Sequence, residues 1–154
     1  MAFRFSLAAV LLVRENAKKR AEQDLRITQL EIARITRQID SLNLDMENTH
    51  KARERAMQLP IPGGELHSFE NRIKAAAKAK RALIERLNIL ELERERKMSI
   101  YHVAHRDLET IVEMRNEQRT AYEQEQNRNE QKQLDDIFAA RSVNETNNNY
   151  SSST

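Results

Sequence analysis

The sequence contains no cysteine and no tryptophan, and only two glycines and two prolines. Without cysteine there is no disulfide framework, no thiolate nucleophile and no cysteine metal site, and the absence fits a reducing compartment. Compact domains draw their turns from Gly, Pro, Asn and Asp, yet here every proline and glycine falls within residues 60–64. The sequence therefore excludes a fold with many tight turns.

Long apolar runs are also missing. No stretch reaches the roughly 18 apolar residues that a membrane-spanning helix needs. The apolar stretch from Leu7 to Val13 is short, and Arg14 and Lys18 follow it where a signal peptide has its small-residue cleavage site. We expect neither a membrane span nor a signal peptide, and therefore a cytoplasmic protein.

Charged residues make up 32% of the chain, with 26 basic and 24 acidic side chains and a net charge of +2. This near-balance is typical of solvated helix surfaces and not of a polycation that binds phosphate backbones. Residues 72–81 hold five bases and no acid, but residues 107–136 hold nine acids and four bases, which repel nucleic acid. We expect no nucleic-acid partner.

Two long stretches show a seam of apolar residues at alternating steps of three and four, the pattern of a coiled coil. The first seam, which contains polar residues before Thr28 and weakens after Met46, runs through Leu7, Leu11, Arg14, Lys18, Ala21, Leu25, Thr28, Ile32, Ile35, Ile39, Leu42, Met46, Thr49, Arg53 and Ala56. The second runs through Leu66, Phe69, Ile73, Ala76, Lys80, Leu83, Leu87, Leu90, Arg94, Lys97, Tyr101, Ala104, Leu108 and Ile111, and touches Tyr122 later.

The segment Leu-Pro-Ile-Pro-Gly-Gly at 59–64 separates the two seams. Proline cannot continue the helical hydrogen-bond ladder, so the segment predicts a break between a helix over 4–58 and a helix over 65–141. Because a narrow seam needs a partner, the helices should fold back on each other. The predicted fold is all-α: one antiparallel coiled-coil hairpin domain over 1–141, with an Asn- and Ser-rich disordered tail over 142–154.

Charge supports the antiparallel register. Residues 38–50 carry acids without bases, and folding about residues 61–62 sets them beside 73–85, which are mostly basic. Each exposed pair contributes only about 0–1 kcal/mol, so the effect is on register. The second helix is the longer one and overhangs the first by about 20 residues. The overhang carries Leu134, Ile137 and Phe138, which have no partner within the predicted hairpin.

No residue pattern indicates catalysis. His102 and His105 share a spacing seen in helical metal sites, but further ligands on the same face are missing. A two-stranded coil offers no pocket around a Ser-His-Asp group, and Gly63-Gly64 lacks the rest of a phosphate-binding loop. We expect no enzyme, no metal, no cofactor and no small-molecule substrate.

Both ends of the chain resemble the flagellar export protein FliJ family. The start does so through Phe3-Arg4-Phe5-Ser6-Leu7, Val10-Leu11 and Arg14-Glu15. The far end does so through Leu108-Glu109 to Arg115, Tyr122, Glu123, Glu125, Glu130-Gln131-Lys132, Leu134-Asp135-Asp136 and Arg141. The chain departs from the family where Asp136 replaces a Glu, and where Ile137 and Phe138 are bulkier than expected.

The resemblance implies a soluble component of the bacterial flagellar type III protein export apparatus. Such proteins resemble the coiled-coil stalk of rotary ATPase gamma subunits. They insert into the hexameric export ATPase, promote its assembly and activity, contact the cytoplasmic domain of the membrane export gate, and meet export chaperones. Together with the open end of the hairpin, the resemblance nominates as ATPase contacts Arg4, Leu7, Leu11, Arg14, Arg115, Tyr122, Gln131, Leu134 and Asp135.

Each of these contacts has a plainer interpretation. Leu7 and Leu11 can equally be seam residues that pack between the two helices. Tyr122 and Leu134 lie past the end of the first helix, so a role in the seam explains them least. For the whole chain, one alternative is a generic coiled-coil scaffold or export chaperone, such as a homodimer, without an ATPase partner. Another is a protein that binds membrane surfaces through residues 3–14.

Overall fold

A computed structural model describes residues 2–153 of the chain. It consists of two helices, α1 (Ala8–Ala56) and α2 (Gly63–Ser151), and the described residues form no strand. The chain divides into two compact units, Glu15–Arg106, which we call the hairpin unit, and Met1–Arg14 with Asp107–Thr154, which we call the terminal unit. The predicted all-α, two-helix architecture is confirmed.

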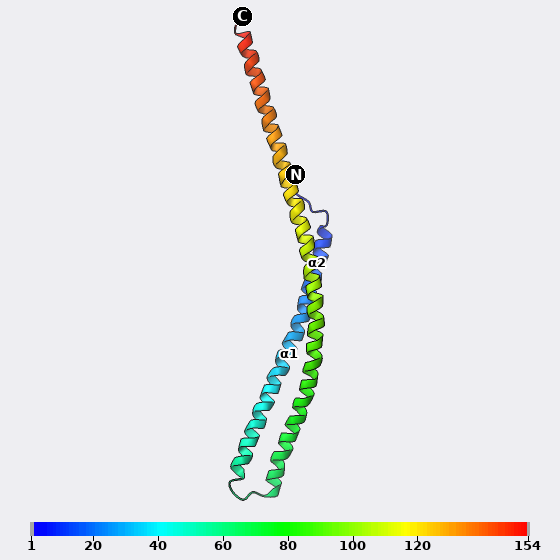
Figure 1. Ribbon diagram of the computed structural model, residues 1–154, viewed down its shortest axis with the longest axis vertical. Helices are drawn as coiled ribbons and strands as arrows, with labels where there is room; N and C mark the ends of the chain where they lie inside the picture. Colours follow the sequence, from blue (N-terminus) through cyan, green and yellow to red (C-terminus); the bar gives the residue numbers. More distant parts are fainter. Residues whose placement is uncertain (1, 154) are drawn as a thin grey trace. The chain divides into compact units, whose positions relative to one another are not determined.

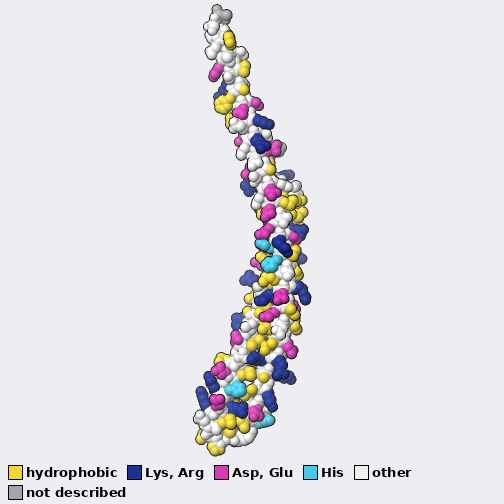
Figure 2. All heavy atoms as spheres, in the orientation of Figure 1, with side chains coloured by type: hydrophobic (Ala, Val, Ile, Leu, Met, Phe, Trp, Pro, Cys, Tyr) yellow, Lys and Arg dark blue, Asp and Glu magenta, His cyan; other side chains and the backbone are white. Residues whose placement is uncertain are grey.

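In the hairpin unit, α1 and α2 run antiparallel and are joined at one end by a short connection (Figure 1). The most deeply buried residues are seam residues: Ile35 and Leu90 are 2% and 1% exposed. In both predicted seams, every residue except Arg14 is buried or half-buried. Side chains of both charge signs are interspersed on the surface seen in Figure 2, as expected for the solvated sides of a coiled coil.

A polar pair interrupts the seam near its middle. Lys97 Nζ donates a hydrogen bond of 2.7 Å to Oγ1 of Thr28, which is only 2% exposed. The Thr28 hydroxyl in turn donates to the backbone oxygen of Asp24, at 3.3 Å. Polar side chains at seam positions select the register of a coiled coil at some cost in stability. The pair therefore favours the alignment that sets Thr28 beside Lys97.

We expect Lys97→Met to raise the free energy of unfolding by about 1 kcal/mol, because it replaces a half-buried ammonium with an apolar side chain of similar length. The Thr28 hydroxyl loses the bond from Lys97 but keeps its bond to Asp24, so it is not left without a hydrogen-bond partner. Urea denaturation followed by circular dichroism measures the change. Lys78→Met, at an exposed position of the same helix, is the control. A stability loss specific to Lys97→Met contradicts this account of the seam.

The connection differs slightly from the predicted break at 59–64. Helix α1 ends at Ala56 and not at 58, while α2 begins at Gly63 and not at 65. The backbone oxygen of Pro62 accepts the first helical bonds, from the amides of Glu65 and Leu66 at 3.1 and 3.4 Å. Neither glycine has a positive φ. The prolines thus explain the break, and the glycines belong to the first turn of α2.

Residues 38–50 lie beside residues 73–85, as predicted: Asp45, Thr49, Ala75 and Ala76 line a common hollow. Within residues 2–153, however, no ion pair joins the two stretches; Glu47 instead pairs with Lys51 of its own helix, at 3.1 Å. In the hairpin unit, an ion pair between the helices joins Arg86 Nη2 to Glu31 Oε1 at 3.4 Å. An exposed charge on one helix has several possible partners within reach. The net charge of a stretch therefore does not predict which residues form ion pairs.

Beyond residue 141 the structure shows a helix where the sequence predicted a disordered tail. Helix α2 continues through the Asn- and Ser-rich segment to Ser151. There, hydroxyls donate back to helix carbonyl oxygens: Thr146 to Ser142, and Ser151 to Asn147 at 3.2 Å. Such bonds are local and need no tertiary partner, which is why a polar composition does not by itself exclude a helix.

Candidate functional site

The terminal unit holds all nine residues nominated as ATPase contacts, because it combines residues 1–14 with residues 107–154. Helix α1 enters this unit only with its first two turns. It begins at Ala8 and not at the predicted residue 4, and the Phe5 carbonyl accepts a bond from the Ala8 amide at 3.3 Å. Arg4 therefore lies in an irregular segment before the helix, and its side chain is exposed.

Three of the nominated residues hold the terminal unit together. Leu7 and Leu11 are half-buried at their seam positions, as the plainer interpretation predicts. Arg14 donates from Nη1 to Oδ2 of Asp107 at 3.0 Å, with both side chains a little under half exposed. These residues explain how the start of α1 stays on α2. They are poorly placed to make large new contacts with a partner.

Tyr122 lies past the end of the first helix, as predicted, but it is nevertheless engaged within the chain. Phe3 packs against it with ring centroids 5.6 Å apart and a tilt of 48° between the rings, which is a favourable aromatic geometry. Phe3 precedes α1, so the N-terminal segment before the helix reaches farther along α2 than the helix does. The aromatic pair, with half-buried Arg115, borders an open hollow lined by Phe3, Arg115, Arg119, Tyr122 and Glu123.

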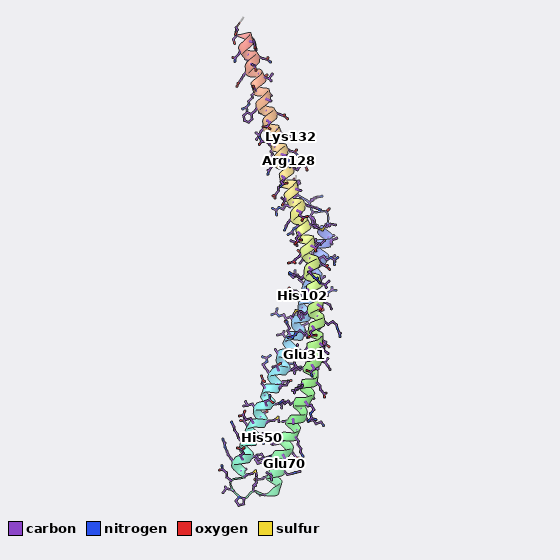
Figure 3. The ribbon with its side chains drawn as sticks, viewed as in Figure 1. Glu31, His50, Glu70, His102, Arg128 and Lys132 are labelled. Carbon is purple, nitrogen blue, oxygen red and sulfur yellow. The ribbon has the colours of Figure 1, made fainter. Side chains whose placement is uncertain are left out.

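Past Tyr122, α2 is a single helix. Every side chain from Glu123 to Ser153 is exposed, and Arg128 and Lys132 are labelled on this part in Figure 3, where no other segment lies beside the helix. The overhang predicted from the sequence is therefore present, and it is longer than expected because α2 runs to Ser151. We call residues 123–151 the distal segment.

The distal segment exposes large apolar side chains. Leu134 and Ile137 are each 49% exposed and Phe138 is 63% exposed. The other two nominated residues of this segment bond to each other: Gln131 Nε2 donates to Asp135 Oδ1 at 3.1 Å across one helical turn. Of the nominated side chains that are exposed, Leu134 and Arg4 form no hydrogen bond, ion pair or ring contact within residues 2–153. As ATPase contacts, all nine residues stay predictions.

Sequence reasoning missed Phe3 and Asp107 as structural partners within this site. Phe3 carried a signal, because it was part of the motif at the start of the chain, but periodicity does not extend to a residue outside a helix. Asp107 is one of many acids on α2, and nothing in its sequence context distinguishes it.

The histidines of the hairpin unit do not form one cluster. His50 lies near the connection, whereas His102 lies much farther along α2 (Figure 3). Tyr101 stacks on His105 with ring centroids 6.0 Å apart, which uses this histidine in packing. Within residues 2–153, no group of three or more potential metal ligands comes together. Over the same residues, neither helix has a stretch long and apolar enough to cross a membrane.

The two units define a class: an antiparallel two-helix coiled coil in the hairpin unit and, in the terminal unit, a second helix that continues past the start of the first. Residues 3–148 match the family model described as flagellar FliJ protein. The chain belongs to the FliJ family, and is thus a component of flagellar protein export. No curated protein and no solved structure shows significant similarity to it.

Proposed function

We propose that this protein is the coiled-coil stalk of the flagellar export ATPase. It inserts into the hexameric ATPase, promotes assembly and activity of the ring, and links it to the cytoplasmic domain of the export gate. It acts on the cytoplasmic side, peripherally attached to the export apparatus at the inner membrane, and serves flagellum assembly and motility. Export chaperones are further candidate partners, and the protein has no catalytic role of its own.

The distal segment is the observation that carries this proposal. Its half-exposed Leu134, Ile137 and Phe138 stand on a single helix in a chain of the FliJ family. Exposed apolar side chains that lie next to one another mark sites of protein–protein interaction. A single projecting helix is also narrow enough to enter the central opening of a ring, with side chains available on every side.

Titration of the export ATPase from the same organism with this protein tests the proposal. We expect a saturable rise in the rate of ATP hydrolysis, accompanied by a shift of the ATPase to hexamers in size-exclusion chromatography. A helical protein that changes neither rate nor assembly contradicts the stalk function and favours a scaffold or chaperone without an ATPase partner.

A further inference from the structure

The distal segment contains a further seam, on a different side of α2 from the seam that packs against α1. The α1-binding seam continues by heptad steps from Tyr122 to Asn129 and Asp136, which are polar. The apolar residues Leu134 and Ile137 lie on a different stripe, whose centre is turned roughly 200° around the helix from that seam. They therefore face away from the side that receives the start of the chain.

Steps of three and four define this further seam, which we call the distal seam. Its residues share one stripe of the helix, since their spacing is that of coiled-coil core positions. All of them are exposed. The distal seam comprises Asn127, Glu130, Leu134, Ile137, Arg141 and Asn144.

The distal seam is complementary to itself in an antiparallel arrangement. Suppose that Leu134 of one copy lies opposite Ile137 of another. Because the helices are antiparallel, the residue four positions before Leu134 then lies opposite the residue four positions after Ile137. Glu130 then faces Arg141, and three residues farther on Asn127 faces Asn144. A twofold axis repeats each pair, so an apolar centre is flanked by an acid–base pair and an amide pair on both sides.

A parallel pairing of the same seam sets like charges opposite each other, Glu130 on Glu130 and Arg141 on Arg141, which is unfavourable. Within residues 2–153, neither Glu130 nor Arg141 makes an ion pair, so both charges are available to a second chain. In addition, a single helix without tertiary contacts is only marginally stable in water, and pairing stabilises it.

We propose that a second copy of this chain covers the distal seam, forming an antiparallel homodimer through residues 127–144. Pairing buries Leu134 and Ile137 and brings Phe138 to the edge of the contact. It therefore competes with any other partner that uses these side chains. In particular, and here the inference rests on the proposed function, the dimer is a storage form that must dissociate before the distal segment enters the ATPase ring.

Sedimentation velocity of the full chain alone tests the dimer. We expect the average mass to rise with concentration from 18.0 kDa toward twice that value. Glu130→Arg and Arg141→Glu should each weaken association roughly tenfold, because each sets like charges opposite each other twice per dimer. The double variant Glu130→Arg/Arg141→Glu should restore association. Glu125→Arg makes the same charge change on the opposite side of the helix and should have no effect.

A disulfide experiment tests the direction of the helices, since the chain has no cysteine of its own. An equimolar mixture of Glu130→Cys and Arg141→Cys proteins should form the mixed disulfide on oxidation, whereas Glu130→Cys alone should not, because its two copies lie about 16 Å apart along the helices. A chain that stays monomeric at all concentrations, or reversals that are not rescued by the double variant, overturns the proposal. Neither result bears on ATPase stimulation, which is measured with the ATPase present.

Discussion

The double variant Leu134→Ala/Phe138→Ala is expected to need about ten- to a hundredfold more protein for half-maximal stimulation of the export ATPase. Leu134 is about half exposed and Phe138 more so, and neither lies in the seam between α1 and α2. Truncating both side chains at an interface is expected to cost about 1.4–2.8 kcal/mol of binding free energy in total, which is ten- to a hundredfold in affinity. Because neither side chain packs within the chain, the helix content measured by circular dichroism should remain that of the unmodified protein.

The distal segment offers a matched control in Val143→Ala/Tyr150→Ala. These side chains are 58% and 78% exposed, but they lie in phase with Tyr122 and so on the other side of the helix. This variant should stimulate as the unmodified protein does. Equal stimulation by the unmodified protein and Leu134→Ala/Phe138→Ala removes the apolar cluster from the ATPase contact. If both double variants lose stimulation equally, the ATPase contact is not confined to the side of the helix that carries Leu134 and Phe138.

Leu90→Ala is expected to lower the free energy of unfolding by about 2–5 kcal/mol, which is a large share of the stability of a small protein. Leu90 is 1% exposed in the hairpin unit, and its truncation leaves a cavity in a seam only one layer deep. Thermal and urea denaturation followed by circular dichroism measure the loss, as a lower midpoint of the unfolding transition.

Leu92→Ala is the control for this substitution. It makes the same change two residues farther along α2, at a side chain that is 63% exposed. Surface substitutions of this kind change stability by no more than about 0.5 kcal/mol. If both variants unfold at the same denaturant concentration, Leu90 does not lie in the core of the hairpin, and the seam does not stabilise it as described.

Much of the fold is readable in the sequence. A seam position tells which way a side chain points, and this follows from helix geometry alone. The seam pattern therefore predicts that Ile35 and Leu90 face the core, and Pro60 and Pro62 locate the break because proline ends a helix wherever it stands in the interior. The projection of Leu134, Ile137 and Phe138 follows from the unequal lengths of the two helices.

The candidate site is only partly readable. The nine nominated residues do share one unit, and Tyr122 does lie past the first helix, but the sequence did not predict that Phe3 packs on it. A segment outside a helix has no periodicity that predicts where it lies. The end of α2 was missed for a related reason, since Asn and Ser favour turns on average but bond to a helix when one is already formed.

The sequence by itself determined the two helices, the break between them, their antiparallel return and the residues that face inward. Each of these depends on the intrinsic geometry of the helix or on proline. Only the tertiary structure decided which residue meets which: Lys97 with Thr28, Arg86 with Glu31, Arg14 with Asp107 and Phe3 with Tyr122. Such pairs depend on how two chain segments are aligned, and many polar residues along each helix are chemically able to make them.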